Sequence, residues 1–128
     1  MNLLATLAGL LTLAAFAVHA VVGAREFRPL APPPEAATRT AYVQALAGWH
    51  WVSVSLLSTG LLFMTIGATD RVPAEAVVLR ALAAYFAACG LAWLLTLVVS
   101  GQGVERRYLA LGQWVFCALV AGLALAAA

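Results

Sequence analysis

The sequence predicts an all-α membrane protein, folded as a single domain that is an antiparallel bundle of four transmembrane helices. The first observation behind this prediction is composition, because 65% of the 128 residues are hydrophobic and only 9% are charged. A soluble domain of this length buries about 60–70% of the surface that its unfolded chain exposes, too little to keep so much apolar surface from water. The second observation is that the charged residues fall in short segments between long apolar runs.

Four charge-free runs follow one another along the chain. They cover residues 1–23, 41–69, 81–104 and 108–128. About 20 helical residues cross a hydrocarbon core of about 30 Å, and each run is at least that long. None of the runs has the period-two alternation of a transmembrane β-strand, and the first has no basic segment before it, so we expect a retained helix there. The predicted spans are residues 2–24, 40–68, 75–100 and 105–127.

The arginines predict the orientation of the four spans. Five of the seven basic residues lie in the first and third loops, which share one side of the membrane. They are Arg25, Arg28, Arg39, Arg106 and Arg107. Basic loops stay in the cytoplasm, so the pattern predicts a protein of the bacterial inner membrane with both termini in the periplasm.

The loops contain the helix-breaking residues. Pro32, Pro33 and Pro34 cannot continue a helix, so we expect the second helix to restart directly after them, with Glu35 in its first turn. Pro73 is expected at the start of the third helix. The glycines of residues 100–107 predict a tight turn, which would make the third and fourth spans antiparallel neighbours.

Small and polar residues predict which face of each helix points inward, because transmembrane helices pack through such residues. Each stripe repeats at steps of three or four residues. The first stripe is Ala5, Ala8, Thr12, Ala15, His19, Gly23 and Glu26, and the second is Ala47, His50, Val54, Ser58, Leu61 and Thr65. The third is Tyr85, Cys89, Ala92 and Thr96, and the fourth is Ala110, Gln113, Cys117, Ala121 and Ala124.

A polar cluster is predicted in the cytoplasmic half of the bundle. Counting residues from the first loop puts His19 and His50 within about 8 Å of each other in depth. An ionisable side chain inside a membrane is a functional candidate by default. The predicted members of the cluster are His19, His50, Arg25, Glu26, Trp49, Trp51, Gln113 and Tyr108.

Several roles for the two histidines remain open. Each could be a neutral imidazole that only holds two helices together by a hydrogen bond. His19 and His50 are also the candidate ligands for a metal, but the sequence has no CxxC, HxxxH or HExxH motif. Haem held between both imidazoles would need the first two helices to sit diagonally, since adjacent helices lie only about 8–10 Å apart. A proton relay opening at Arg25 and Glu26 is a further alternative.

Catalysis has less support than binding. No GxSxG motif is present. Cys89 and Cys117 lie inside apolar runs, where a thiol is more often a small packing residue than a nucleophile.

Two segments carry a resemblance to a known group. "HAVVGAREFRPL" at the end of the first span, together with "GWHWVSVSLL" in the second, resembles a group of small four-span bacterial membrane proteins with no established activity. The matching positions are His19, Gly23, Arg25, Pro29, Leu30, Trp49 and His50, and they cover about half of the chain. The resemblance implies the four-span architecture and a common role for His19 and His50, and it implies nothing about a substrate.

These observations favour a protein without an enzymatic role of its own. We expect an accessory or assembly subunit of a membrane complex, or a small homo-oligomer, whose partners are the lipid bilayer and other membrane subunits or copies of itself. A net charge of +2, dispersed along the chain, does not indicate nucleic acid. The alternative is a bundle that binds a proton, a small ligand, a metal or haem through His19 and His50, and the sequence identifies no cofactor.

Overall fold

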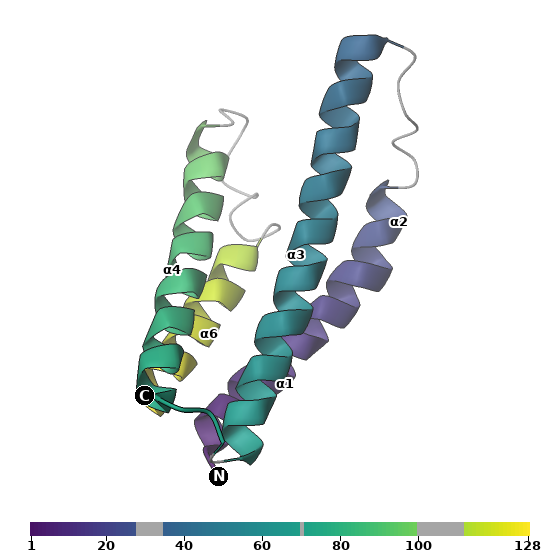
Figure 1. Ribbon diagram of the computed structural model, residues 1–128. Helices are drawn as coiled ribbons and strands as arrows, with labels where there is room; N and C mark the ends of the chain where they lie inside the picture. Colours follow the sequence, from purple (N-terminus) through teal and green to yellow (C-terminus); the bar gives the residue numbers. More distant parts are fainter. Residues whose placement is uncertain (28–34, 70, 100–111) are drawn as a thin grey trace.

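The computed structural model describes residues 1–27, 35–69, 71–99 and 112–128, apart from the side chains of residues 26, 27 and 37, and this part of the chain is helical throughout, with short turns (Figure 1). The helices are α1 (Leu3–Val18), η1 (His19–Gly23), α2 (Ala24–Phe27), α3 (Ala36–Ala68), α4 (Glu75–Val99) and α6 (Gln113–Ala127). The η1 segment is π-helical and continues α1 directly into α2. α3 begins directly after Glu35, so the predicted restart behind the prolines is confirmed, but Glu35 is the N-cap residue and does not lie in the first turn as predicted.

Within the described residues, three helical stretches are long and apolar enough to cross a membrane. They are Leu3–Gly23, Thr38–Ala68 and Glu75–Val99. α6 is also apolar, but with 15 residues it is shorter than each of these three stretches. The first part of the predicted fourth span, residues 105–111, and the predicted third-loop turn lie outside the described residues. The described part of the chain is therefore all helical, and three of its helical stretches have the lengths of membrane-spanning helices.

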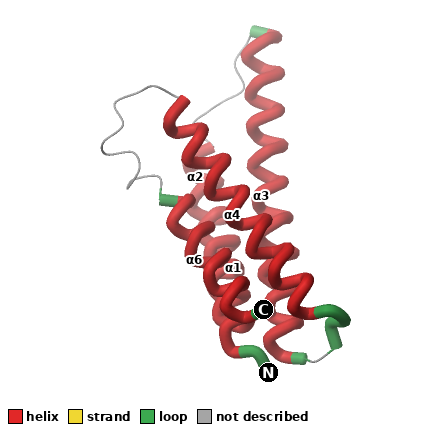
Figure 2. Tube along the Cα trace, turned by 90° about the vertical axis from the view of Figure 1, so that its left-hand side faces the viewer, coloured by secondary structure: helices red, strands yellow, loops and turns green. Residues whose placement is uncertain are grey.

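The helices are arranged as two pairs. α1 packs along α3, α4 packs along α6, and α1 also contacts α6. Both termini lie at the same end of the molecule, and α3 and α4 diverge toward the other end (Figures 1 and 2). The buried core sits at the end that holds the termini. Its residues include Ala5, Ala8, Phe63, Ile66, Leu79, Phe86 and Val120.

Asn2 joins the ends of four helices. Its side-chain oxygen accepts a hydrogen bond from the backbone N–H of Ala5 (3.1 Å), which caps α1. Its side-chain Nδ2 donates both to Oε1 of Glu75 at the start of α4 (3.0 Å) and to the carbonyl of Ala127 at the end of α6 (2.9 Å). Its backbone N–H donates to the carbonyl of Gly67 near the end of α3 (3.0 Å). One short polar side chain thus fixes the meeting point of the two helix pairs.

Glycines let α1 and α3 approach closely over their shared length. A Cβ on Gly9 of α1 would stand 2.9 Å from the side chain of Met64, and a Cβ on Gly60 of α3 would stand 2.8 Å from that of Leu13. Further along, a Cβ on Gly67 would meet the side chain and backbone of Thr6. Thr6, Gly9 and Leu13 of α1 therefore face Gly67, Met64 and Gly60 of α3, in that order. Residue numbers rise along α1 while they fall along α3, so the two helices run in opposite directions.

The predicted inward stripe of the first span is confirmed at four of its seven positions, while Ala15 and His19 are half-buried and the side chain of Glu26 lies outside the described residues. Ala5, Ala8 and Thr12 are fully buried, and Gly23 is buried as well. The Thr12 hydroxyl donates to the carbonyl of Ala8 (2.7 Å), so the helix itself satisfies this polar group.

The predicted inward stripe of the second span is wrong. All six of its members, His50 included, are exposed, whereas the buried residues among the described side chains of α3 are Gly60, Phe63, Ile66 and Gly67. The error has a physical reason, because a hydroxyl on a helix can bond to its own helix and needs no inward partner. Thr65 donates to the carbonyl of Leu61 in this way (2.9 Å).

The stripes of the last two spans are confirmed in part. In α4, Cys89 is half-buried but Tyr85, Ala92 and Thr96 are exposed, and the buried residues lie to one side of the predicted stripe. They are Leu79, Leu82, Ala83, Phe86, Gly90 and Leu97. In α6, Cys117 and Ala121 are half-buried and Ala124 is fully buried, as predicted, while Gln113 is exposed and Ala110 lies outside the described residues.

Candidate functional site

His19 and Trp49 are two members of the predicted polar cluster that contact each other directly. The imidazole of His19 stacks on the indole of Trp49, with ring centroids 3.6 Å apart and an interplanar angle of 18°. Nε2 of His19 lies 3.2 Å from the backbone carbonyl oxygen of Trp49. Both side chains are half-buried. The pair therefore links the upper part of the first span to α3, far from the Asn2 junction.

The contact with a carbonyl decides which nitrogen of His19 carries hydrogen. A carbonyl oxygen can only accept, so Nε2 must be the donor, and in the neutral ring Nδ1 is then unprotonated. The carbonyl of Trp49 also accepts a hydrogen bond from the hydroxyl of Ser53 (3.3 Å). In this structure the Nε2–H of His19 therefore forms a hydrogen bond that links two helices.

A local change in the helix accompanies this pair. The π-helical turn η1 starts at His19 and ends at Gly23, and the backbone N–H of His19 points to the carbonyls of both Ala15 and Phe16. Single π-turns inside α-helices are uncommon and frequently occur at functional sites. Gly23 at the end of this turn lies directly under the indole of Trp49, which would overlap any Cβ placed there. His19, Gly23 and Trp49 form one packed unit, which we name the His–Trp clamp.

His50 lies outside the His–Trp clamp. It follows Trp49 on α3, its side chain is exposed, and it has no hydrogen-bond or ring partner among the described residues. At about 1.5 Å per residue, His50 is about 25 Å along α3 from Gly67, and His19 is about 25 Å along the first span from Asn2. The two imidazoles therefore share a depth, but no contact between them is present in the described residues.

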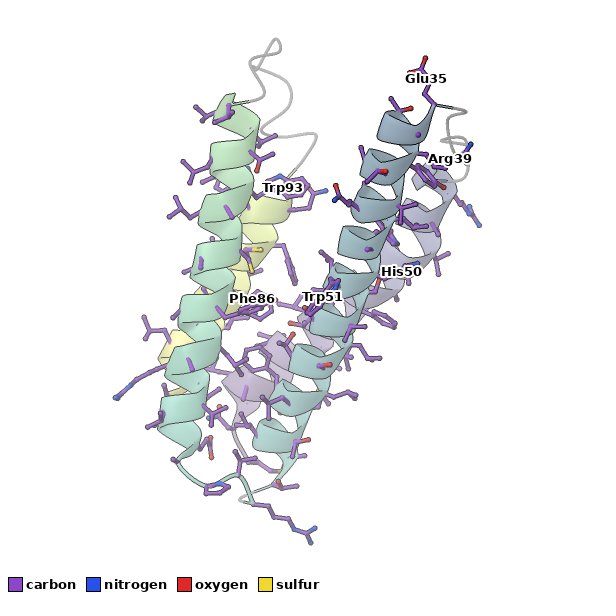
Figure 3. The ribbon with its side chains drawn as sticks, turned by 45° about the horizontal axis from the view of Figure 1, so that its top comes forward. Glu35, Arg39, His50, Trp51, Phe86 and Trp93 are labelled. Atoms are coloured by element: carbon purple, nitrogen blue, oxygen red, sulfur yellow. The ribbon has the colours of Figure 1, made fainter. Side chains whose placement is uncertain are left out.

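The other predicted cluster residues are spread over the surface. Trp51 is 75% exposed and leaves α3 in a different direction from His50 (Figure 3). Arg25 and Gln113 are exposed, at α2 and at the start of α6. The side chain of Glu26 and all of Tyr108 lie outside the described residues. A shared site for these groups stays a prediction.

The donors needed for a metal site are not assembled in the described part of the chain. No group of three His, Cys, Asp or Glu side chains comes together there. The Nε2 atom of His19 already donates to a carbonyl, and the side chain of His50 is exposed, so the two imidazoles do not fit facing axial ligands of a haem.

The two cysteines lie on neighbouring helices. A Cβ on Gly90, the residue after Cys89, would stand 3.1 Å from the Cβ of Cys117. Cys89 and Cys117 are each half-buried, in α4 and α6. This packing agrees with the expectation that the two cysteines are small packing residues.

Sequence reasoning named the three residues of the His–Trp clamp but not the way they pack, and it missed Asn2, which organises the helix ends. Asn2 directly before an apolar run is an ordinary signal for a helix N-cap, and it could have been found. The role of Gly23 was visible only as part of a small-residue stripe, because its large partner Trp49 comes from another helix. Every buried side-chain nitrogen and oxygen of the described residues has a hydrogen-bond partner.

Comparison with known proteins gives no relative for this arrangement. No protein-family model, no curated protein and no solved structure matches the chain.

Proposed function

We propose that the protein is a non-enzymatic subunit of the bacterial inner membrane that binds another transmembrane helix through the exposed face of α3. In this proposal the chain crosses the membrane four times as an antiparallel bundle, with both termini in the periplasm. α2, which contains Arg25, and the start of α3, which contains Arg39, lie at the end opposite the termini (Figure 1), and an excess of basic residues in cytoplasmic loops supports this orientation.

The observation that carries the proposal is the position of His50. The stretch from Thr38 to Ala68 has the length and hydropathy of a membrane span, and His50 lies within it with an exposed side chain. Ionisable residues in spans almost always face protein or a water-filled cavity, because contact with hydrocarbon costs a few kcal/mol. A partner helix on this face would supply the missing protein contact.

The length of α3 supports the same role. Its 33 residues extend about 50 Å, well beyond a hydrocarbon core of about 30 Å. α3 reaches past the neighbouring helices at the end away from the termini (Figure 1). Val43, Trp51 and Val54 are all more than half exposed along it. A long helix that its own bundle covers on one side only has room for a second protein.

The alternative of a ligand-binding bundle centred on both histidines has less support. His19 uses Nε2 and one ring face to hold η1 to α3, and the side chain of His50 is exposed. A histidine that only links two helices explains His19 fully.

Photo-cross-linking in native membranes tests the proposal. The photoreactive amino acid p-benzoylphenylalanine is placed at Val54, which is 62% exposed on α3, and in a separate variant at Leu91, which is 58% exposed on α4. The two positions have matched exposure and both lie inside charge-free runs. We expect a discrete protein adduct from position 54 and only lipid adducts from position 91. Lipid adducts alone at both positions would refute the proposed role of α3.

A further inference from the structure

We propose that the partner on the exposed face of α3 is a second copy of this chain, and that the His50 imidazoles of the two copies hydrogen-bond to each other. This inference rests on the proposed function, because it names the occupant of the same face. The face consists of Ala47, His50, Val54, Ser58, Leu61 and Thr65, all exposed, and we name it the outer α3 face.

The chemistry of His50 favours a copy of itself as the partner. A neutral imidazole carries one N–H donor and one bare nitrogen acceptor, so two imidazoles can pair with each other. An interface with twofold symmetry joins the same patch on both subunits and therefore requires such a self-complementary group. No other ionisable or amide side chain stands on the outer α3 face.

Insertion into one membrane aligns the α3 helices of the two copies. Two copies inserted in the same orientation present parallel α3 helices, and each residue of the outer α3 face then meets its counterpart at the same depth. Because the two copies are identical, His50 of one copy is at the same depth as His50 of the second copy. Any different protein would need a hydrogen-bonding group at a matching depth, about 25 Å along the helix from Gly67.

The shape of the outer α3 face permits close approach. Ala47 and Ser58 are small, and small residues let transmembrane helices come near enough for packing and polar contacts. A Cβ on the adjacent Gly48 would meet nothing within 4 Å, so the space beside Ala47 is open in the single chain. The hydroxyl of Thr65 is already bonded to the carbonyl of Leu61, so it adds no unsatisfied donor to the interface.

Disulfide cross-linking tests the geometry. Cys89 and Cys117 are replaced by alanine, and a single cysteine is placed at Val54 or, as the matched control, at Leu91. Each variant is reconstituted into phosphatidylcholine vesicles and oxidised with copper phenanthroline. We expect a covalent dimer in at least tenfold higher yield from position 54 than from position 91. Equal yields from both positions would overturn the proposal.

Substitution of His50 tests the chemistry in the same vesicles. Dimer formation is measured by energy transfer between two differently labelled populations of the full chain. One transmembrane hydrogen bond corresponds to about threefold to tenfold in association, so His50→Leu should weaken the dimer by that factor. His50→Asn keeps a donor and an acceptor and should recover part of the loss. Unchanged association in His50→Leu would overturn the His50 pairing.

The mass of the photo-adduct separates this inference from the proposed function. An adduct at position 54 with the mass of two copies supports both statements. An adduct that contains a different protein leaves the proposed function standing and overturns the homodimer. Circular dichroism of each variant confirms that helicity is kept, so a loss of association reflects the interface and not unfolding.

Discussion

The indole of Trp49 lies directly over Gly23, in the space that the Cβ of any other residue at position 23 would need. The same indole stacks on His19 at 3.6 Å. A glycine and a histidine four residues apart on one helix thus hold a single tryptophan from another. The clamp depends on the absence of a side chain at position 23 as much as on the presence of one at position 19.

Gly23→Ala should destabilise the protein, because the new methyl group overlaps the ring of Trp49. Overpacking of this kind costs about 1–3 kcal/mol, and the indole cannot move away without losing the stack on His19. Gly48→Ala is the matched control on α3, since a Cβ there meets nothing within 4 Å. It should be neutral or stabilise by up to about 1 kcal/mol, the gain from alanine in a helix. The free energy of unfolding in mild detergent distinguishes the two, and equal effects would contradict the packing of the clamp.

Gly67→Ala should be at least as damaging as Gly23→Ala. A Cβ at position 67 would stand 2.7 Å from the backbone nitrogen of Thr6, and a backbone atom cannot rotate out of the way. Separating α1 from α3 here also stretches the hydrogen bond from the Asn2 N–H to the Gly67 carbonyl. Gly122→Ala in α6 meets nothing within 4 Å and serves as control. Thermal unfolding followed by circular dichroism should show a lower midpoint for the first variant only.

Replacing His19 separates its two contacts with Trp49. His19→Ala removes both the stack and the hydrogen bond to the Trp49 carbonyl, which together are worth about 1–2 kcal/mol. His19→Phe keeps an aromatic ring for stacking and loses only the hydrogen bond, so it should recover about half of that loss. The near-ultraviolet circular dichroism of the tryptophans and the free energy of unfolding report the two effects. If phenylalanine restores nothing, the hydrogen bond alone holds the clamp.

The three long apolar helices could be predicted from the sequence because a hydrocarbon core excludes charge. The end of α3 at Ala68 and the start of α4 at Glu75 agree with the predicted boundaries. The buried face of the first span was also readable, since Ala5, Ala8 and Thr12 are small residues at helical spacing. These features depend on one helix and the lipid around it, so the sequence of that helix alone is enough to predict them.

Features that depend on two helices were not readable in the same way. The face of α3 was misassigned because Ser58 and Thr65 were treated as groups in need of an inward partner, and His50 was placed inward with them. The π-turn at His19 has no marker in "HAVVG", since it accompanies the fit of Gly23 against Trp49. The expected meeting of His19 with His50 required knowledge of how α3 is rotated, which the pattern of residues on α3 alone does not supply.

Asn2 and Glu75 offer a test of the junction at the other end of the bundle. Asn2→Asp keeps an oxygen that can cap α1 but loses the Nδ2 donor to Glu75 and to the Ala127 carbonyl, and it sets two carboxylates against each other. We expect a loss of about 1–3 kcal/mol, the cost of an unpaired polar contact. Adding Glu75→Gln should recover part of it, because the new amide can donate to the carboxylate now at position 2. Asn2→Ser, which keeps only the cap, should fall between the wild type and Asn2→Ala. A double variant no more stable than Asn2→Asp alone would show that positions 2 and 75 are not coupled, as a double-mutant cycle measures directly.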